Sequence, residues 1–138
     1  MTQEDKELLL KDLCARLPYG VKILHEGWNF EWDDELSTVE KVVGIDKDFI
    51  YTKVINTHNG EEYRDDKWPI DTFDNKLFLR PMSSMTDEQK SQYNFYLTRI
   101  VSAHDASLLI DWLNKNHFDY RGLIKKGLAI DATGLNIY

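Results

Sequence analysis

The sequence predicts an α+β fold with an N-terminal helix, a small curled antiparallel sheet or half-barrel of about five strands, and a C-terminal cluster of two to three helices. Apolar residues recur every three or four positions at the start of the chain, then alternate every second position from Tyr19 to Arg80. After Pro81 the helical spacing returns. A chain of 138 residues fits one domain, in which residues 1–80 form the helix and sheet and residues 81–138 pack on them.

Residues 2–17 are predicted to form an amphipathic helix. Thr2 can cap its N-terminus, with Asp5 three positions further on in a variant of the capping box. Pro18 and Gly20 are expected to end the helix. Its predicted apolar stripe consists of Leu9, Leu10, Leu13, Cys14 and Leu17.

Five short segments in the next part of the chain have the alternating pattern of strands. They are residues 20–25, 38–45, 49–55, 61–64 and 76–79. In the second segment the alternation puts Val39, Val43 and Ile45 on one face. Glu40 is expected on the opposite face. The turn Asp46-Lys47 is predicted to join the second and third strands as a hairpin.

Capping signals predict the C-terminal helices. Thr86 and Gln89 form a capping box before the first of them, Ser102 can cap the second, and Asp119 can cap the third. The predicted helices run to about residue 101, over residues 105–115 and, as a short third helix, over residues 120–126. The remaining residues, 128–138, are expected to form a tail strapped onto the rest of the chain.

The negative charge of the protein is confined to its first half. The net charge is -7, and residues 1–80 contain 11 Lys and Arg against 18 Asp and Glu, whereas residues 81–138 contain six of each. An acidic surface repels the phosphate backbone, whose binding requires clustered Lys and Arg. Nucleic-acid binding through the first half is therefore disfavoured.

Three segments resemble a group of short uncharacterised proteins encoded by Bacteroides-type gut bacteria and by their prophages and mobile elements. The segments are residues 8–21 (LLLKDLCARLPYGV), 79–88 (LRPMSSMTDE) and 112–124 (WLNKNHFDYRGLI), the last followed by Gly127-Leu128-Ala129. The resemblance implies a phage-associated or mobile-element context. It transfers no functional residue.

No residue pattern predicts an enzyme. The four histidines include no pair four residues apart and no zinc-protease spacing. Cys14 lies on the predicted apolar stripe of the first helix, where a free cysteine acts as a small hydrophobe. Ser83-Ser84 precede a helix, where serines cap more often than they attack. We therefore expect no catalytic residue, no metal ligand and no cofactor.

Three sequence features predict a cytoplasmic protein. Cys14 is the single cysteine, so no internal disulfide can form. No stretch approaches the roughly 18 consecutive apolar residues that a membrane span requires. The first five residues, MTQED, lack the cationic and apolar pattern of a secretory signal.

Aromatic residues are interleaved with the acidic clusters of the first half. Trp28, Phe30 and Trp32 alternate, which puts the three rings on one face of a strand or extended loop, and Asp33-Asp34 follow them. Trp68 lies beside a second acidic cluster. This face either packs into the core or forms an aromatic surface with an acidic rim, which suits a basic protein partner. The leading hypothesis is a non-enzymatic accessory or interaction protein of phage or mobile-element origin that binds another protein through this surface.

The alternative hypothesis is a weak DNA-binding or DNA-associated regulator. Four of the six basic residues of the C-terminal part form its basic patch: Lys115, Arg121, Lys125 and Lys126. Two capped helices joined by about four residues resemble a helix-turn-helix in length. The second of these helices is short for reading a groove, and lysines in a last helical turn are expected from the helix dipole alone.

Overall fold

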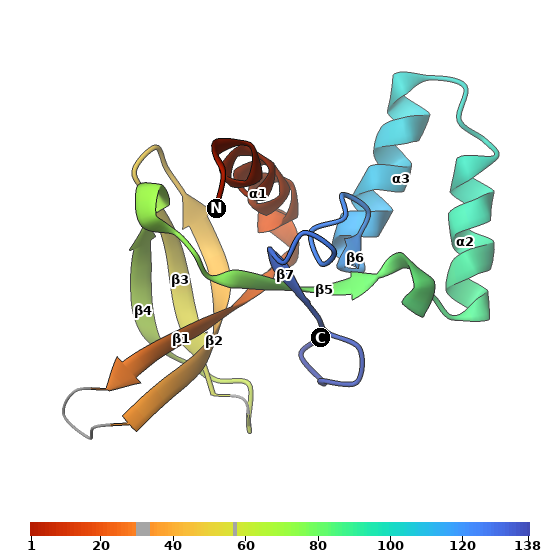
Figure 1. Ribbon diagram of the computed structural model, residues 1–138. Coiled ribbons are helices and arrows are strands. Elements are labelled where there is room, and N and C mark those ends of the chain that lie inside the picture. Colours follow the sequence, from red (N-terminus) through yellow and green to blue (C-terminus); the bar gives the residue numbers. More distant parts are fainter. Residues whose placement is uncertain (30–33, 57) are drawn as a thin grey trace.

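The computed structural model describes the backbone of residues 1–29, 34–56 and 58–138, and their side chains except those of residues 27–29 and 34–36 (Figure 1). It confirms the α+β class, with one helix at the N-terminus, a mixed sheet, and two helices near the C-terminus. The helices are α1 (Gln3–Arg16), α2 (Asp87–Leu97) and α3 (Ala103–Lys115). The strands are β1 (Lys22–Asn29), β2 (Asp34–Ile45), β3 (Phe49–Ile55), β4 (Glu62–Pro69), β5 (Lys76–Pro81), β6 (Phe118–Asp119) and β7 (Ala129–Asp131).

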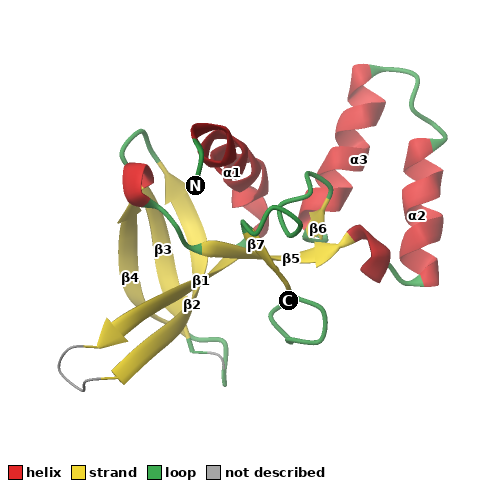
Figure 2. Cartoon of the chain, in the orientation of Figure 1, coloured by secondary structure: helices red, strands yellow, loops and turns green. Residues whose placement is uncertain are grey.

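The sheet is larger than predicted and is not purely antiparallel (Figure 2). Strands β1 to β4 form an antiparallel meander, and β5 returns to pair antiparallel with β1. β6 and β7 pair parallel with β5, so the described chain has seven strands where the sequence predicted about five. The sheet does not close into a barrel, because β4 pairs only with β3 and forms an open edge. With two and three residues, β6 and β7 are too short to show an alternating pattern.

The inner face of β2 differs from the prediction. Glu40 is completely buried and Val42 nearly so, whereas Val43 is 42 % exposed. The register of β2 against β3 shifts after Val42, which makes Val43 the extra residue of a β-bulge. Ile45 therefore packs against the core as predicted, while Val39 is left on the outer face. The expected outward position of Glu40 is wrong.

The first helix begins as predicted but buries a different stripe. The Thr2 hydroxyl accepts a hydrogen bond from the Asp5 amide at 3.0 Å, and the Asp5 carboxylate accepts one from the Thr2 amide. Cys14 is exposed, which contradicts its predicted place on the apolar stripe. The buried residues of α1 are Leu9, Asp12, Leu13 and Arg16. A charged pair thus replaces Cys14 on the inner face.

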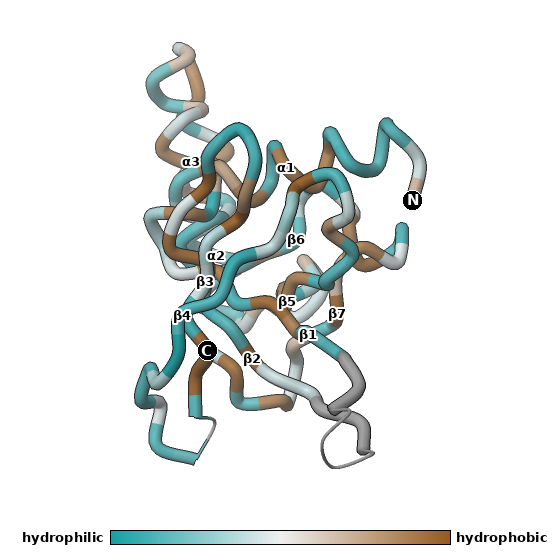
Figure 3. The backbone as a smooth tube through the Cα atoms, turned by 90° about the vertical axis from the view of Figure 1, so that its left-hand side faces the viewer, coloured by the Kyte–Doolittle hydropathy of each residue, from teal (hydrophilic) through white to brown (hydrophobic). Residues whose placement is uncertain are grey.

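Two apolar clusters hold the described chain together. The larger one lies between α1 and the sheet, where β5 crosses the middle of the molecule and colours brown in Figure 3. The smaller one, beneath α2 and α3, consists of Met85, Leu109, Leu113 and Phe118. The outer strand β4 is teal in Figure 3, and its charged residues suit an open sheet edge.

The C-terminal part contains two of the three predicted helices. The capping box of Thr86 and Gln89 opens α2, which ends at Leu97 and not near residue 101. Ser102 caps α3 as predicted. The third helix, over residues 120–126, is absent: the chain makes a single turn there, and β7 follows it. The Asp119 carboxylate still accepts hydrogen bonds from the first amides of this turn. The predicted cap is therefore present, but no helix follows it.

Candidate functional site

Most of the predicted aromatic–acidic surface cannot be placed. Phe30, Trp32 and Asp33 lie outside the described residues. Trp28 belongs to β1 and Asp34 to β2, but their side chains also lie outside the described part.

Trp68 is half-buried in a hydrogen-bonded cluster centred on Glu40. Its indole N–H donates to Glu40 Oε1 at 3.1 Å, and its ring packs against His25 at a tilt of 35°, with a centroid distance of 4.1 Å. Thr52 donates to the same carboxylate at 2.6 Å, and Thr38 donates to it at 2.9 Å. Three neutral donors therefore satisfy a fully buried carboxylate, and no described Lys or Arg pairs with it. The cluster joins β2, β3 and β4, so it stabilises the sheet.

The fold pairs one residue of the predicted basic group with an acidic side chain. Arg121 Nη1 donates to Asp12 Oδ1 at 2.9 Å, and its guanidinium lies 4.7 Å from the centre of the Tyr120 ring. Lys115, Lys125 and Lys126 are exposed. Because Arg121 is paired with a carboxylate of α1, it is not available as a free charge for phosphate.

A buried ion pair links α1 to the C-terminal part of the chain. Arg16 Nε donates to Asp12 Oδ2 at 2.8 Å, and Arg16 Nη2 donates to the Phe118 carbonyl at 2.6 Å. Both charged side chains are fully buried. Arg121 adds a second cation to the same carboxylate. Each charge has a partner, which is the condition under which buried ions are tolerated.

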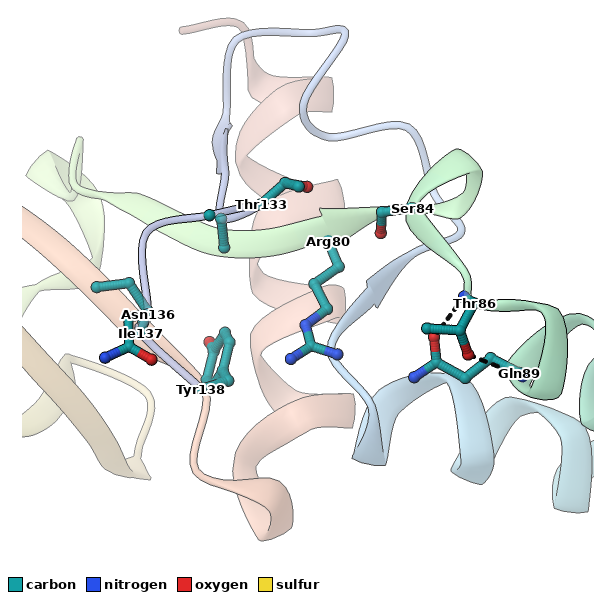
Figure 4. A pocket seen from close by; sticks show the side chains of 10 residues that line it. Arg80, Ser84, Thr86, Gln89, Thr133, Asn136, Ile137 and Tyr138 are labelled. Carbon is teal, nitrogen blue, oxygen red and sulfur yellow. Dashed lines mark hydrogen bonds between the residues drawn. The ribbon is translucent and has the colours of Figure 1, made fainter.

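A cavity of about 410 Å³ opens where β5, the start of α2 and the C-terminal segment meet (Figure 4). Arg80 is the only charged side chain among the described residues that line it. Its guanidinium extends into the space between Tyr138 and Gln89 (Figure 4). The polar lining consists of Arg80, Ser84, Thr86, Gln89, Thr133, Asn136 and Tyr138.

A half-buried histidine lies beside this cavity. His117 stacks on Tyr138 with ring centroids 3.5 Å apart. The pKa of His117 is lowered to about 4, mainly by burial and in smaller part by the nearby cations Arg16, Arg80 and Lys22. Burial also raises the pKa of the Tyr138 hydroxyl. His117 is therefore neutral near pH 7, and Arg80 is the cation that lines the cavity itself.

The hairpin formed by α2 and α3 projects from the rest of the protein (Figure 1). Six of the ten large hydrophobic side chains exposed in the described chain lie on it, and we call them the hairpin surface: Phe95, Leu97, Ile100, Val101, Leu108 and Ile110. Val101 is 92 % exposed, and α2 contains no buried residue. The guanidinium of Arg99 lies over the Phe95 ring, 3.6 Å from its centre.

Sequence reasoning missed the cavity and the hairpin surface. The cavity combines residues 80–89 with residues 132–138, and no local pattern shows that these segments meet. A signal for the hairpin surface was present, because α2 carries apolar residues on more than one side, but its exposure could not be inferred from spacing.

Comparisons with known proteins leave these sites without a precedent. No family model, curated protein or solved structure matches the chain. Within the described residues, no helix is long and apolar enough to cross a membrane. In the same part of the chain, no three His, Cys, Asp or Glu side chains gather closely enough to hold a metal ion.

Proposed function

We propose that the chain is a non-enzymatic interaction protein that docks another protein on the hairpin surface. The observation that carries this proposal is the absence of any buried residue in α2, although the helix contains Tyr93, Phe95, Tyr96 and Leu97. An amphipathic helix of a monomeric domain normally buries its apolar stripe against the core. Here Tyr93 and Tyr96 pack partly against the smaller cluster, while Phe95 and Leu97 face solvent.

The size of the hairpin surface suits a protein partner. The six residues are between 37 and 92 % exposed, so together they present apolar area on the order of several hundred square ångströms. The largest apolar patch on a typical monomer is about 300 to 600 Å² and is often functional. A standard interface buries about 800 Å² per partner, so the hairpin surface would form the apolar part of such an interface.

The charge of the hairpin also favours contact with a protein. Residues 87–115 contain three Lys and Arg and four Asp and Glu, so the hairpin is nearly neutral while the sheet half is strongly acidic. A neutral apolar surface neither repels a partner nor attracts nucleic acid. The resemblance of residues 8–21, 79–88 and 112–124 supports a phage or mobile-element origin for this interaction protein.

Contact through the acidic and aromatic residues of the sheet half is a second proposed surface. In the described chain its support is Tyr63, which is 61 % exposed on the open strand β4 among acidic neighbours. A basic partner would suit this surface. DNA binding through Lys115, Lys125 and Lys126 has less support, because Arg121 is paired with Asp12 and the second helix of the proposed motif is a single turn.

Site-specific photo-crosslinking in the producing cell separates these surfaces. The photoreactive residue p-benzoylphenylalanine replaces Val101 on the hairpin, Tyr63 on β4, or Val43 as an exposed control on β2. We expect a protein adduct from position 101 that position 43 does not give. An adduct from position 63 alone would show that the partner contacts the acidic sheet surface instead. Adducts of equal yield from all three positions would contradict docking on the hairpin.

The DNA-binding alternative has its own test. A gel shift that weakens with added salt and disappears in the Lys115/Lys125/Lys126 triple alanine variant would favour it. No shift at low salt would exclude it. Protein docking on the hairpin predicts that the triple variant keeps the adduct from position 101.

A further inference from the structure

We propose that the cavity beside Arg80 binds the carboxylate group of a small organic acid. Arg80 is half-buried, its side chain makes no ion pair with any described Asp or Glu, and it extends into the cavity (Figure 4). Removing a charge from water is costly unless the charge is paired, so a ligand that displaces water from this cavity must bring a partner for Arg80. An unpaired guanidinium in a cavity therefore identifies the charge of the ligand as negative.

The neutral side chains around Arg80 supply further donors. The Thr86 amide donates to Gln89 Oε1 at 2.9 Å, which fixes the orientation of the Gln89 side-chain amide. Because Oε1 is occupied, the Nε2 group of Gln89 is the part of the amide left to donate. The Thr86 hydroxyl accepts from the Gln89 backbone at 3.1 Å and keeps its own proton for a ligand. Asn136 contributes a second side-chain amide to the lining.

The number of available cations favours a carboxylate over a phosphate. Arg16 is paired with Asp12, and Lys22 Nζ donates to the Ile137 carbonyl at 2.5 Å, so neither is directed at the cavity as a free charge. Arg80 alone therefore offers one positive charge, which matches a monoanion. Its planar fork can donate two parallel hydrogen bonds to the two oxygens of a carboxylate.

The remaining walls indicate the rest of the ligand. Ala132, Ile137 and the Tyr138 ring add apolar contacts to the lining. A volume of about 410 Å³ lies within the range of small-molecule sites. The lowered pKa of His117 keeps that ring neutral, so it adds no competing charge near pH 7. A small acid with an apolar or aromatic body fits these walls.

A titration followed by ¹⁵N NMR tests this site with three probes that share a ring: benzoate, benzamide and phenyl phosphate. We expect benzoate to shift the side-chain amide signals of Gln89 and Asn136 in a saturable way, with a Kd of about 1 to 10 mM. Benzamide, which lacks the charge, should not saturate in that range. Equal shifts from benzamide, tighter binding of phenyl phosphate, or no saturation with benzoate would overturn the proposal.

Two substitutions at Arg80 sharpen the result. Arg80→Gln removes the cation and should weaken benzoate binding about tenfold or more. Arg80→Lys keeps the positive charge but cannot donate two parallel hydrogen bonds, so its affinity for benzoate should lie between those of the unmodified chain and Arg80→Gln. This second variant keeps the proposal testable if Arg80→Gln does not fold. The matched control is Lys126→Gln, which removes an exposed cation elsewhere and should bind benzoate like the unmodified chain. Unchanged binding in both Arg80 variants would also reject the site.

Discussion

The packing of α1 on the sheet and the packing of α2 on α3 differ in what they bury. Beneath α1 and within the sheet, even charged groups are enclosed: Asp12, Arg16 and Glu40 have no exposed surface, and each of the two carboxylates accepts at least two hydrogen bonds. On the hairpin, Val101 and Phe95 are apolar but remain in solvent. The region beneath α1 thus uses buried polar groups to hold the fold together. The hairpin leaves apolar groups exposed, where a partner can contact them.

This contrast separates residues that stabilise the chain from residues that recognise something. A buried group is costly to remove because its partners lose their hydrogen bonds. An exposed apolar group contributes little to folding, so its presence at several positions of one hairpin points to binding. Substitutions in the two regions should therefore differ most in their effect on the free energy of unfolding.

Arg16→Ala should have the largest effect. It leaves the Phe118 carbonyl without its donor and deprives the buried Asp12 of one of two cations. We expect a loss of about 3 to 5 kcal/mol in the free energy of unfolding, measured by urea denaturation. Lys126→Ala, at an exposed lysine, is the control. A loss no greater than that of the control would show that the buried pair does not hold α1 in place.

Glu40→Ala should have the second largest effect on the free energy of unfolding. Three donors, from Thr38, Thr52 and Trp68, would be left in the sheet without an acceptor. The expected loss is about 2 to 4 kcal/mol by the same measurement. Glu26→Ala removes an exposed carboxylate from β1 and should change stability by less than about 0.5 kcal/mol. Equal effects at the two glutamates would contradict the inward position of Glu40.

His117 predicts a pH dependence of intermediate size. Its pKa in the folded chain is about 4, whereas an unfolded histidine binds a proton below about pH 6.5. The unfolded state therefore holds more protons between these values, and stability is lost as the pH falls through this range. The loss should be on the order of 1 to 2 kcal/mol, since the ring is partly exposed to solvent screening.

The variant His117→Asn isolates this contribution. Asparagine tolerates the left-handed backbone at this position, where φ is +62°, and has no proton to gain. Urea denaturation at about pH 7 and about pH 4.5 should show a smaller acid loss in His117→Asn than in the unmodified chain. His104→Asn, on the exposed start of α3, is the matched control. Identical acid losses with and without His117 would refute the buried neutral ring.

Val101→Ser should have the smallest effect on stability. Val101 is 92 % exposed, so its loss should cost less than about 0.5 kcal/mol. The same substitution at Val54, which has no exposed surface, should cost about 2 to 4 kcal/mol. Comparable losses at the two valines would mean that the tip of the hairpin is packed in the free protein, and the docking proposal would fail.

Local signals predicted the parts of the fold whose causes lie within a few residues. The capping interactions at Thr2, Thr86 and Ser102 each join groups three positions apart, and all three are present. The Asp46-Lys47 turn is also present, with the Asp46 carboxylate accepting from the Asp48 and Phe49 amides. Such signals do not set the length of an element, which is why α2 ends early and residues 120–126 make only one turn.

The candidate sites could not be predicted in the same way. Glu40 faces inward because its partners come from β3 and β4, and because the bulge at Val43 changes the phase of β2. The cavity needs residues 80–89 beside residues 132–138. A repeat of apolar residues every two or 3.6 positions shows which face of one strand or helix is apolar. It does not show which residues of another segment pack against that face.

The sequence by itself determined the α+β class, the helix starts, the central hairpin and the confinement of the negative charge to residues 1–80, because each depends on composition or on near neighbours. The tertiary structure alone decided which charges are buried, that Arg80 lines a cavity with no described acidic partner, and which apolar residues of α2 remain in solvent. The physical reason is that burial and pairing are properties of contacts: Asp12 meets Arg121 across 109 residues, a separation that no local pattern spans.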